Sequence, residues 1–349
     1  MPRRTPTSVL FPRSLARLVP VLALASLGLA ACGGGESGSS SGGPQVVASS
    51  YPFAFVLERV GGDLVDVQNL TAPGAEPHDL ELSPRQVADL SDADLVVFEK
   101  GFQPHVDDAL AEADLPADAV LDVAMVADAE ATGFSTEHGD ETEHGDEAEH
   151  GDEHAGAEEP HAEDAGDEHA EEEHADELDP HVGLDPLRML DITAAVEERL
   201  VEADPDNAEA YRDNAAALAQ EIRRLDQDFT EGLASCERRT IVTGHAAFAY
   251  LADRYDLTQI AIAGIDPHAE PSPAQQAEVA DLVEHEGITT VFTEALVPSA
   301  VAESIADETG VTVSRLDPIE GLSDETSDET YVTLMQANLD AIQDANSCS

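Results

Sequence analysis

Short apolar runs alternate with stretches of helical spacing along most of this chain. In the first half, strand-like runs occupy 44–50, 64–70 and 95–101, with helix-like stretches at 51–62 and 83–94. After Cys236 the alternation repeats, with strand-like runs at 239–245, 257–265, 288–294 and 311–318 and helix-like stretches at 246–255, 272–287 and 297–310. Strands that alternate with helices of this length predict parallel sheets built from right-handed crossovers. We therefore expect two similar α/β lobes.

A long amphipathic stretch lies between the two lobes. Asp204 and Pro205 supply an N-cap and a first-turn proline. Beyond them, apolar residues recur at steps of four and three, which places one stripe on a helix face: Tyr211, Ala215, Leu218, Ile222, Leu225, Phe229 and Leu233. About 29 residues at 1.5 Å each give a rod of roughly 44 Å. An ordinary long core helix would show the same stripe, but the lobes on both sides favour a bridge.

An almost purely acidic run interrupts the first half. Residues 137–179 contain 21 Asp or Glu, seven His and no Lys or Arg. Such a segment buries too little apolar surface to fold, so we predict a disordered insertion. Its histidines are candidate weak auxiliary metal ligands: His138, His144, His150, His154, His161, His169 and His174. On composition alone, an acidic spacer explains the run equally well.

The N-terminus has the composition of an export signal. Four arginines precede an apolar run from Leu18 to Cys32 that is too short to span a bilayer comfortably. The letters LAAC, ending at Cys32, resemble the bacterial lipobox, in which the cysteine is lipidated. A Gly- and Ser-rich tether follows at 33–44. An ordinary secretory signal with a coincidental cysteine is the alternative, but box and tether together favour a lipid anchor on Cys32.

Charge and cysteine content narrow the function further. The net charge is −58 at pH 7, which argues against nucleic acid because binding phosphates needs Lys and Arg. Cys236 and Cys348 follow the lipobox cysteine, without any CxxC spacing. In an exported protein such a pair predicts a disulfide rather than a thiol metal site; two free thiols are the alternative.

These patterns divide the chain into segments. We predict a signal peptide at 1–31 and a tether at 32–44, followed by an N-terminal α/β lobe at 45–203 that contains the acidic insertion at 137–179. A linking helix at 204–235 and a C-terminal α/β lobe at 236–349 complete the chain. The predicted fold class is α/β, with two lobes that each hold a mainly parallel sheet flanked by helices. One long helix joins them, and a ligand cleft lies between the lobes.

Isolated ligand-type residues fall near the ends of predicted strands. His78 follows the run that ends near Leu70, and His245 and Asp317 each come directly after a strand. His181 lies where the acidic run ends and a helix begins. In open α/β sheets, ligands bind beyond the carboxyl ends of the strands, so we expect these four side chains to meet in one cleft. Three imidazoles and one carboxylate suit zinc, which usually takes four N, O or S ligands.

Other candidate residues receive more ordinary assignments. A single buried histidine bonded to backbone is commoner than a ligand, and we assign His105, His268 and His285 to that class. Glu76 and Asp79 flank His78 and are candidates to orient an imidazole. They would equally fit a solvated acidic surface.

Four motifs together resemble a known family. EPHDLELSP, DPHVGLDP, VTGHAAFAYL and LDPIEGL, in this order and spacing, are similar to motifs of the metal-binding lipoproteins of ABC-type zinc and manganese importers. The resemblance runs from about Gln45 to about Cys348. It implies two parallel-sheet lobes joined by a rigid helix, with the metal held between them by His78, His181, His245 and Asp317. Many zinc-type members also carry a His- and acid-rich loop before the second ligand.

The resemblance also implies a function. Manganese-type members usually have glutamate at the third ligand position, so His245 favours Zn²⁺ as the transported ion, with Mn²⁺ possible. The protein would be a monomer, lipid-anchored to the outer face of the bacterial cell membrane, that captures zinc and delivers it to an ABC permease and its ATPase. The acidic run would be a weak collecting surface.

Three alternatives stay open at this point. The first is a homologue that binds Mn²⁺ or Fe²⁺, and the second is a zinc-buffering or adhesive surface lipoprotein without a permease. The third is a zinc hydrolase, whose site would keep one position open for water. No HExxH motif and no nucleophile elbow occur in the sequence, so we expect a binding protein and not an enzyme.

Overall fold

The computed structural model describes residues 42–129 and 178–349. The predicted signal peptide, Cys32, most of the tether and all seven histidines of the acidic run lie outside these residues, so the predictions for them stay predictions. Within the described ranges, no helix is long and apolar enough to cross a membrane.

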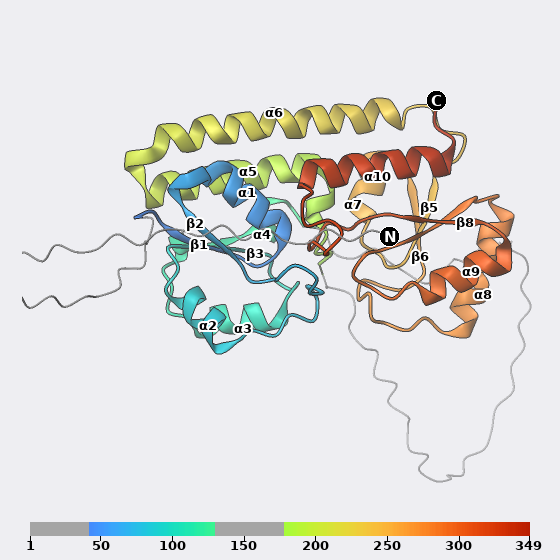
Figure 1. The fold of residues 1–349 in the computed structure, drawn as a ribbon, viewed down its shortest axis with the longest axis horizontal. Helices are drawn as coiled ribbons and strands as arrows, with labels where there is room; N and C mark the ends of the chain where they lie inside the picture. The colour runs from blue at the N-terminus through green and yellow to red at the C-terminus, as the bar shows by residue number, and fades with distance from the viewer. Residues whose placement is uncertain (1–41, 130–177) are drawn as a thin grey trace, which may run out of the picture. The chain divides into compact units, whose positions relative to one another are not determined.

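The first lobe is built around a four-stranded parallel sheet (Figure 1). Its elements are β1 (Gln45–Ala48), α1 (Tyr51–Gly61), β2 (Asp66–Asn69), α2 (Pro84–Ser91), β3 (Leu95–Phe98), α3 (Pro104–Glu112), β4 (Val120–Asp122) and α4 (Val123–Val126). The strand order is β2-β1-β3-β4. Val47 of β1 pairs with Gln68 on one side and Val96 on the other.

The second lobe repeats this arrangement. Its elements are β5 (Thr240–Thr243), α7 (Ala249–Arg254), β6 (Thr258–Ala261), α8 (Pro273–His285), β7 (Thr290–Thr293), α9 (Ala300–Thr309), β8 (Thr312–Arg315) and α10 (Tyr331–Asn346). The strands are again all parallel, in the order β6-β5-β7-β8. The predicted fold of two parallel-sheet α/β lobes flanked by helices is confirmed, and both lobes share one topology.

Two long helices lie between the sheets in sequence, α5 (Pro186–Ala203) and α6 (Ala208–Gly232). The predicted N-cap Asp204 and first-turn Pro205 lie three residues too early for α6, because Pro205–Asn207 forms a 3₁₀ turn first. The Asp204 carboxylate accepts hydrogen bonds from Asn207 and Tyr211 instead of capping the helix at its first turn. The helix therefore has 25 residues, about 38 Å of length.

The apolar stripe of α6 is buried as predicted. Its buried residues are Tyr211, Ala215, Leu218, Ile222, Leu225 and Phe229. The helix packs against α1 and α5 of the first lobe and against α10 of the second, and Figure 1 shows α5 and α10 following one another along it. One helix face therefore joins the cores of both lobes.

Each sheet has one face toward this shared core and one face toward its own pair of helices. In β1, Val46 and Ala48 belong to the shared core, whereas Val47 faces the cluster under α2 and α3. In β5, Ile241 belongs to the shared core, and Val242 faces α8 and α9. The alternation follows the two-residue period of a strand, and the central strands of each sheet are mostly buried on both faces because both faces are covered.

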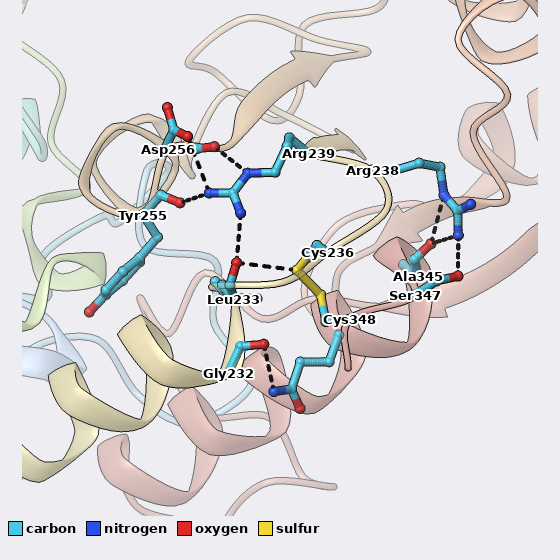
Figure 2. The surroundings of a disulfide bond; sticks show 11 residues. Gly232, Leu233, Cys236, Arg238, Arg239, Tyr255, Asp256, Ala345, Ser347 and Cys348 are labelled. Atoms are coloured by element: carbon cyan, nitrogen blue, oxygen red, sulfur yellow. Dashed lines mark hydrogen bonds and ion pairs between the residues drawn. A yellow bond between two sulfur atoms is a disulfide. The ribbon is translucent and has the colours of Figure 1, made fainter.

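The end of the chain is tied back by the predicted disulfide between Cys236 and Cys348 (Figure 2). Two arginines reinforce the connection. The Arg238 guanidinium donates to the Ala345 carbonyl at 2.8 Å, and Arg239 donates to the Leu233 carbonyl at 2.6 Å. The disulfide and Arg238 thus fix the C-terminal end of α10 beside the end of α6.

We expect the loss of this disulfide to lower the free energy of unfolding by about 2–4 kcal/mol, because it closes a long loop in the unfolded chain. The two cysteines are 112 residues apart. Urea denaturation of the parent and of the Cys236→Ser/Cys348→Ser variant measures the difference. A reducing agent is the control, since it should shift the parent's midpoint and leave the variant's unchanged. Equal midpoints for the oxidised parent and the variant would contradict the prediction.

Candidate metal centre

Three histidines and one glutamate converge between the two lobes. His78 lies in the loop from β2 to α2, and His181 lies at the turn that precedes α5. His245 lies two residues after the end of β5, and Glu320 lies in the loop between β8 and α10. One ligand atom from each of these four side chains lies within 4.8 Å of all the others. Each half of the chain thus supplies two donors to one cluster.

The distances within the cluster suit a single small ion. The Nε2 atoms of His181 and His245 are 3.3 Å apart. Glu320 Oε1 lies 2.7 Å from His181 Nε2, 3.1 Å from His78 Nε2 and 3.8 Å from His245 Nε2. Zinc bonds of about 2.0–2.1 Å in a tetrahedron place neighbouring ligand atoms roughly 3.4 Å apart. The four donors therefore stand close to the spacing that a tetrahedral ion requires.

Buried carboxylates fix which ring nitrogen faces the cluster. Asp179 Oδ1 lies 2.7 Å from His181 Nδ1, and Glu294 Oε2 lies 2.6 Å from His245 Nδ1. Each Nδ1–H donates to its carboxylate, which leaves the Nε2 lone pair free to point into the cluster. Both rings are nearly fully buried, at 3% and 1% exposed. They are therefore oriented before any ion arrives.

The loop that carries His78 is held from several sides. Gln103 donates from Nε2 to the Pro77 carbonyl at 3.1 Å. The His78 ring meets Phe102 edge to face, with centroids 4.8 Å apart. The Gly74 amide donates to the Leu322 carbonyl, across to the loop that carries Glu320. The His78 loop and the Glu320 loop are thus connected by their backbones as well as by their side chains.

The same carboxylates change the proton affinity of the imidazoles. Burial alone lowers the pKa of His181, but hydrogen bonds with Asp179 and Glu320 outweigh it and raise the pKa to about 9. The same balance, with Glu294 in place of Asp179, raises the pKa of His245 to about 10. Burial acts to raise the pKa of Glu320, but hydrogen bonding and charge from His181 hold it well below its usual range. Without metal, the site therefore holds protons at neutral pH.

A buried carboxyl group lies beside the cluster without belonging to it. Glu99 directly follows β3, is 3% exposed, and lines a small cavity with His181 and Glu320. Burial raises the pKa of Glu99 well above its usual range, and the charges of Asp179 and Asp122 raise it further. Burial therefore favours the uncharged form of the Glu99 carboxyl beside the cluster.

The structure does not place Asp317 with the three histidines. Its Oδ1 accepts a hydrogen bond from the Ile319 amide at 2.9 Å, and its Oδ2 accepts one from Arg315 at 2.9 Å. Its backbone is bonded to Asn338 through both N–H and C=O. Both carboxylate oxygens are thus engaged within their own loop, and Glu320, three residues later, occupies the position expected for Asp317.

The Asp317 carboxylate stabilises an unusual turn. Ile319 has φ of 59°, a left-handed conformation that is costly for a β-branched residue. The bond from the Ile319 amide to Asp317 holds this turn, and the Tyr51 amide donates to the Glu320 carbonyl from the other lobe. Asp317 therefore stabilises the turn that immediately precedes Glu320.

The residue pattern had signals for some of the groups that sequence reasoning missed. Glu294 is the last residue of the predicted strand-like run at 288–294, just as His245 is the last residue of the run at 239–245. Asp179 is separated from His181 by one proline, but the acidic run before it hides its role. Glu320 belongs to the recognised motif LDPIEGL, in which the predicted ligand is Asp317. Glu76 and Asp79, which are candidates from sequence either to orient an imidazole or to be surface acids, lie against His268, at 3.5 and 3.3 Å.

Two parallel-sheet lobes that each supply two donors to one buried cluster define a two-lobed solute-binding protein. The chain belongs to the ZnuA family, the zinc-uptake complex component A, periplasmic, whose profile matches residues 46–345.

The chain is also similar to individual zinc-binding proteins in sequence and in structure. The zinc-binding lipoprotein AdcA of Streptococcus pneumoniae is 33% identical over 323 residues, 92% of this chain, although the chain spans only 59% of that protein. The high-affinity zinc uptake system protein ZnuA of Bacillus subtilis is 30% identical over 93% of this chain and 96% of its own length. The Zn(II)-bound ZnuA-like domain of Streptococcus pneumoniae AdcA superimposes with a TM-score of 0.64 at 30% identity, covering 87% of this chain and 99% of that domain.

Glu320→Gln is expected to weaken zinc binding by at least about 10-fold, since it removes a charged oxygen donor from the cluster. Asp317→Asn is the matched comparison, because an asparagine oxygen still accepts from the Ile319 amide and keeps the turn. We expect Asp317→Asn to leave the affinity close to that of the parent. Competition titration with a zinc chelator measures both. A loss for Asp317→Asn as large as that for Glu320→Gln would restore Asp317 as the ligand.

Zinc binding is expected to release about one proton or more per ion at pH 7, because metal needs the neutral imidazole and the pKa of His181 and of His245 is raised above 6.5. The affinity for zinc should therefore rise with pH, and it should keep rising toward pH 9 instead of levelling off near pH 7. Calorimetry in buffers of different ionisation enthalpy counts the protons. Glu294→Gln, which removes a carboxylate that raises the pKa of His245, should release fewer. Proton-free binding at pH 7 would contradict the prediction.

Proposed function

We propose that this protein captures Zn²⁺ outside the cell membrane and delivers it to an ABC permease. The observation that carries the proposal is the convergence of three oriented imidazoles and Glu320 on one buried point between the lobes. Membership in the zinc-uptake family gives the cluster its biological setting. The ion is cargo, so the site must bind zinc tightly and still release it.

The donor set favours zinc over the alternative ions. Three nitrogen donors and one carboxylate oxygen suit zinc, whereas Mn²⁺ and Mg²⁺ sites are richer in oxygen. Both His181 and His245 have a carboxylate behind them, which raises the basicity of the nitrogen that binds the metal. A homologue that carries Mn²⁺ or Fe²⁺ remains the alternative.

The number of donors argues for binding rather than catalysis. A catalytic zinc site keeps a coordination position open for water, with three protein ligands. Here His78, His181, His245 and Glu320 together supply four donors, so a tetrahedral ion would be fully coordinated by protein. We therefore propose a transport protein and not a zinc hydrolase.

The remaining parts of the proposal rest on the sequence. Cys32 would carry the lipid that anchors the protein to the outer face of the membrane, and the following tether would keep it near the permease and its ATPase. The histidines of the acidic run would bind zinc weakly and supply it to the centre. The proposed division is an N-terminal lobe at 45–203, a linking segment at 204–235 that contains α6, and a C-terminal lobe at 236–349.

His78→Ala and His245→Ala are each expected to lose the single tight zinc, because each removes an oriented donor from the cluster. His285→Ala is the matched control, since its ring lies on the exposed side of α8 with 84% of the side chain accessible. Metal analysis and calorimetry of the lipid-free proteins measure binding. Uptake of zinc at limiting concentration, in cells that rely on the introduced copy, measures delivery.

The outcomes separate binding from delivery. Variants that kept one tight zinc per chain would refute the proposed centre. A parent that binds zinc but does not support uptake in the presence of its permease would refute the delivery step while leaving the centre intact.

A further inference from the structure

A second group of potential ligands lies outside the centre. Glu76, Asp79 and His268 place one ligand atom each within 4.8 Å of the others. His268 Nε2 is 3.3 Å from Asp79 Oδ2 and 3.5 Å from Glu76 Oε2. We call these three residues the outer cluster. None of them belongs to the centre formed by His78, His181, His245 and Glu320.

The outer cluster joins equivalent loops of the two lobes. Glu76 and Asp79 lie between β2 and α2, and His268 lies between β6 and α8. Because both sheets have the same strand order, these loops correspond. Their sequences correspond too: each contains an acid-Pro-His triplet, EPH at 76–78 and DPH at 266–268, followed by a Ser-Pro helix start. His268 is thus the counterpart of His78 in the second lobe.

Matching capping boxes fix where both loops end. Ser83 caps α2 with Gln86, and Ser272 caps α8 with Gln275. Within the first loop, the Asp79 amide donates to Glu76 Oε2 at 3.0 Å. The two loops therefore present their side chains from rigid starting points.

The geometry of the outer cluster suits a small divalent ion. Its separations of 3.3 and 3.5 Å match the roughly 3.4 Å edge of a tetrahedral zinc site. Glu76 presents Oε2 to His268 and to the Asp79 amide, and the Glu76 side chain is mostly buried, with 12% exposed. One imidazole nitrogen and two carboxylate oxygens are donor types that a divalent transition metal accepts.

We propose that the outer cluster is a second site for a divalent transition metal, with Glu76, Asp79 and His268 as ligands and water completing the coordination. It binds less tightly than the centre, because it has one imidazole instead of three and Asp79 and His268 are exposed. An ion held there links a loop of the first lobe to a loop of the second by coordinate bonds. The site stands independently of zinc delivery to a permease.

The test compares zinc binding by three full-length mature chains: the parent, His268→Ala and His285→Ala. All three carry the same acidic run, so binding by its histidines is common to them and cancels. By equilibrium dialysis against Zn²⁺, we expect His268→Ala to bind about one ion fewer per chain than the parent and His285→Ala to match the parent. Equal stoichiometry for all three chains would overturn the proposal.

Anomalous diffraction from crystals of the parent grown with Zn²⁺ is a second, position-specific measurement. A zinc peak among Glu76, Asp79 and His268 that disappears in His268→Ala, while the peak at His181 and His245 stays, supports the outer site. A peak at the centre alone, at saturating zinc, overturns it. Absence of the central peak would instead refute the proposed function, so the two failures are distinguishable.

Discussion

The candidate centre depends on one continuous apolar core that both lobes share. The buried face of α6 packs against α1, α5 and α10, and the inner faces of both sheets close onto the same cluster. Core packing of this kind is dense and resists deformation, so it fixes how far apart the strand ends of the two lobes lie. Backbone bonds from Tyr51 to Glu320 and from Gly74 to Leu322 then connect the loops across the gap. The shared core and these backbone bonds together bring metal donors from distant parts of the sequence into one cluster.

The electrostatics of the centre are a balance between buried charges of opposite sign. Burial of any one of the carboxylates Asp179, Glu294 and Glu320 would be costly alone. Each is compensated by an imidazole that it holds in position, and the imidazoles take protons in return. Zinc replaces those protons as the compensating charge. Protons and metal therefore compete for the same imidazole lone pairs. The hydrogen bonds that orient the rings also raise the pKa of His181 and His245, and so they determine how strongly protons compete.

The fold and the histidines were accessible from sequence because both rest on local signals. Strand and helix periods predict both sheets, and the ends of parallel strands locate His245. The choice between Asp317 and Glu320 was not accessible, since both acids lie in one short loop and its direction depends on the left-handed Ile319. Sequence reasoning assigns His268, with His105 and His285, to ordinary buried histidines, but its side chain is 38% exposed and lies against Glu76 and Asp79, a contact between loops that the sequence alone does not show. The start of α6 was missed because Asp204 bonds within its own turn.

Ile319 connects the folding stability of the protein with the position of the metal donor Glu320. Glycine would adopt the left-handed turn at no steric cost, yet the isoleucine side chain is 1% exposed and belongs to the shared core. The isoleucine side chain thus fills space in the shared core next to Glu320, although its backbone is locally strained. Residue 319 therefore affects both the packing of the shared core and the position of the loop that carries Glu320.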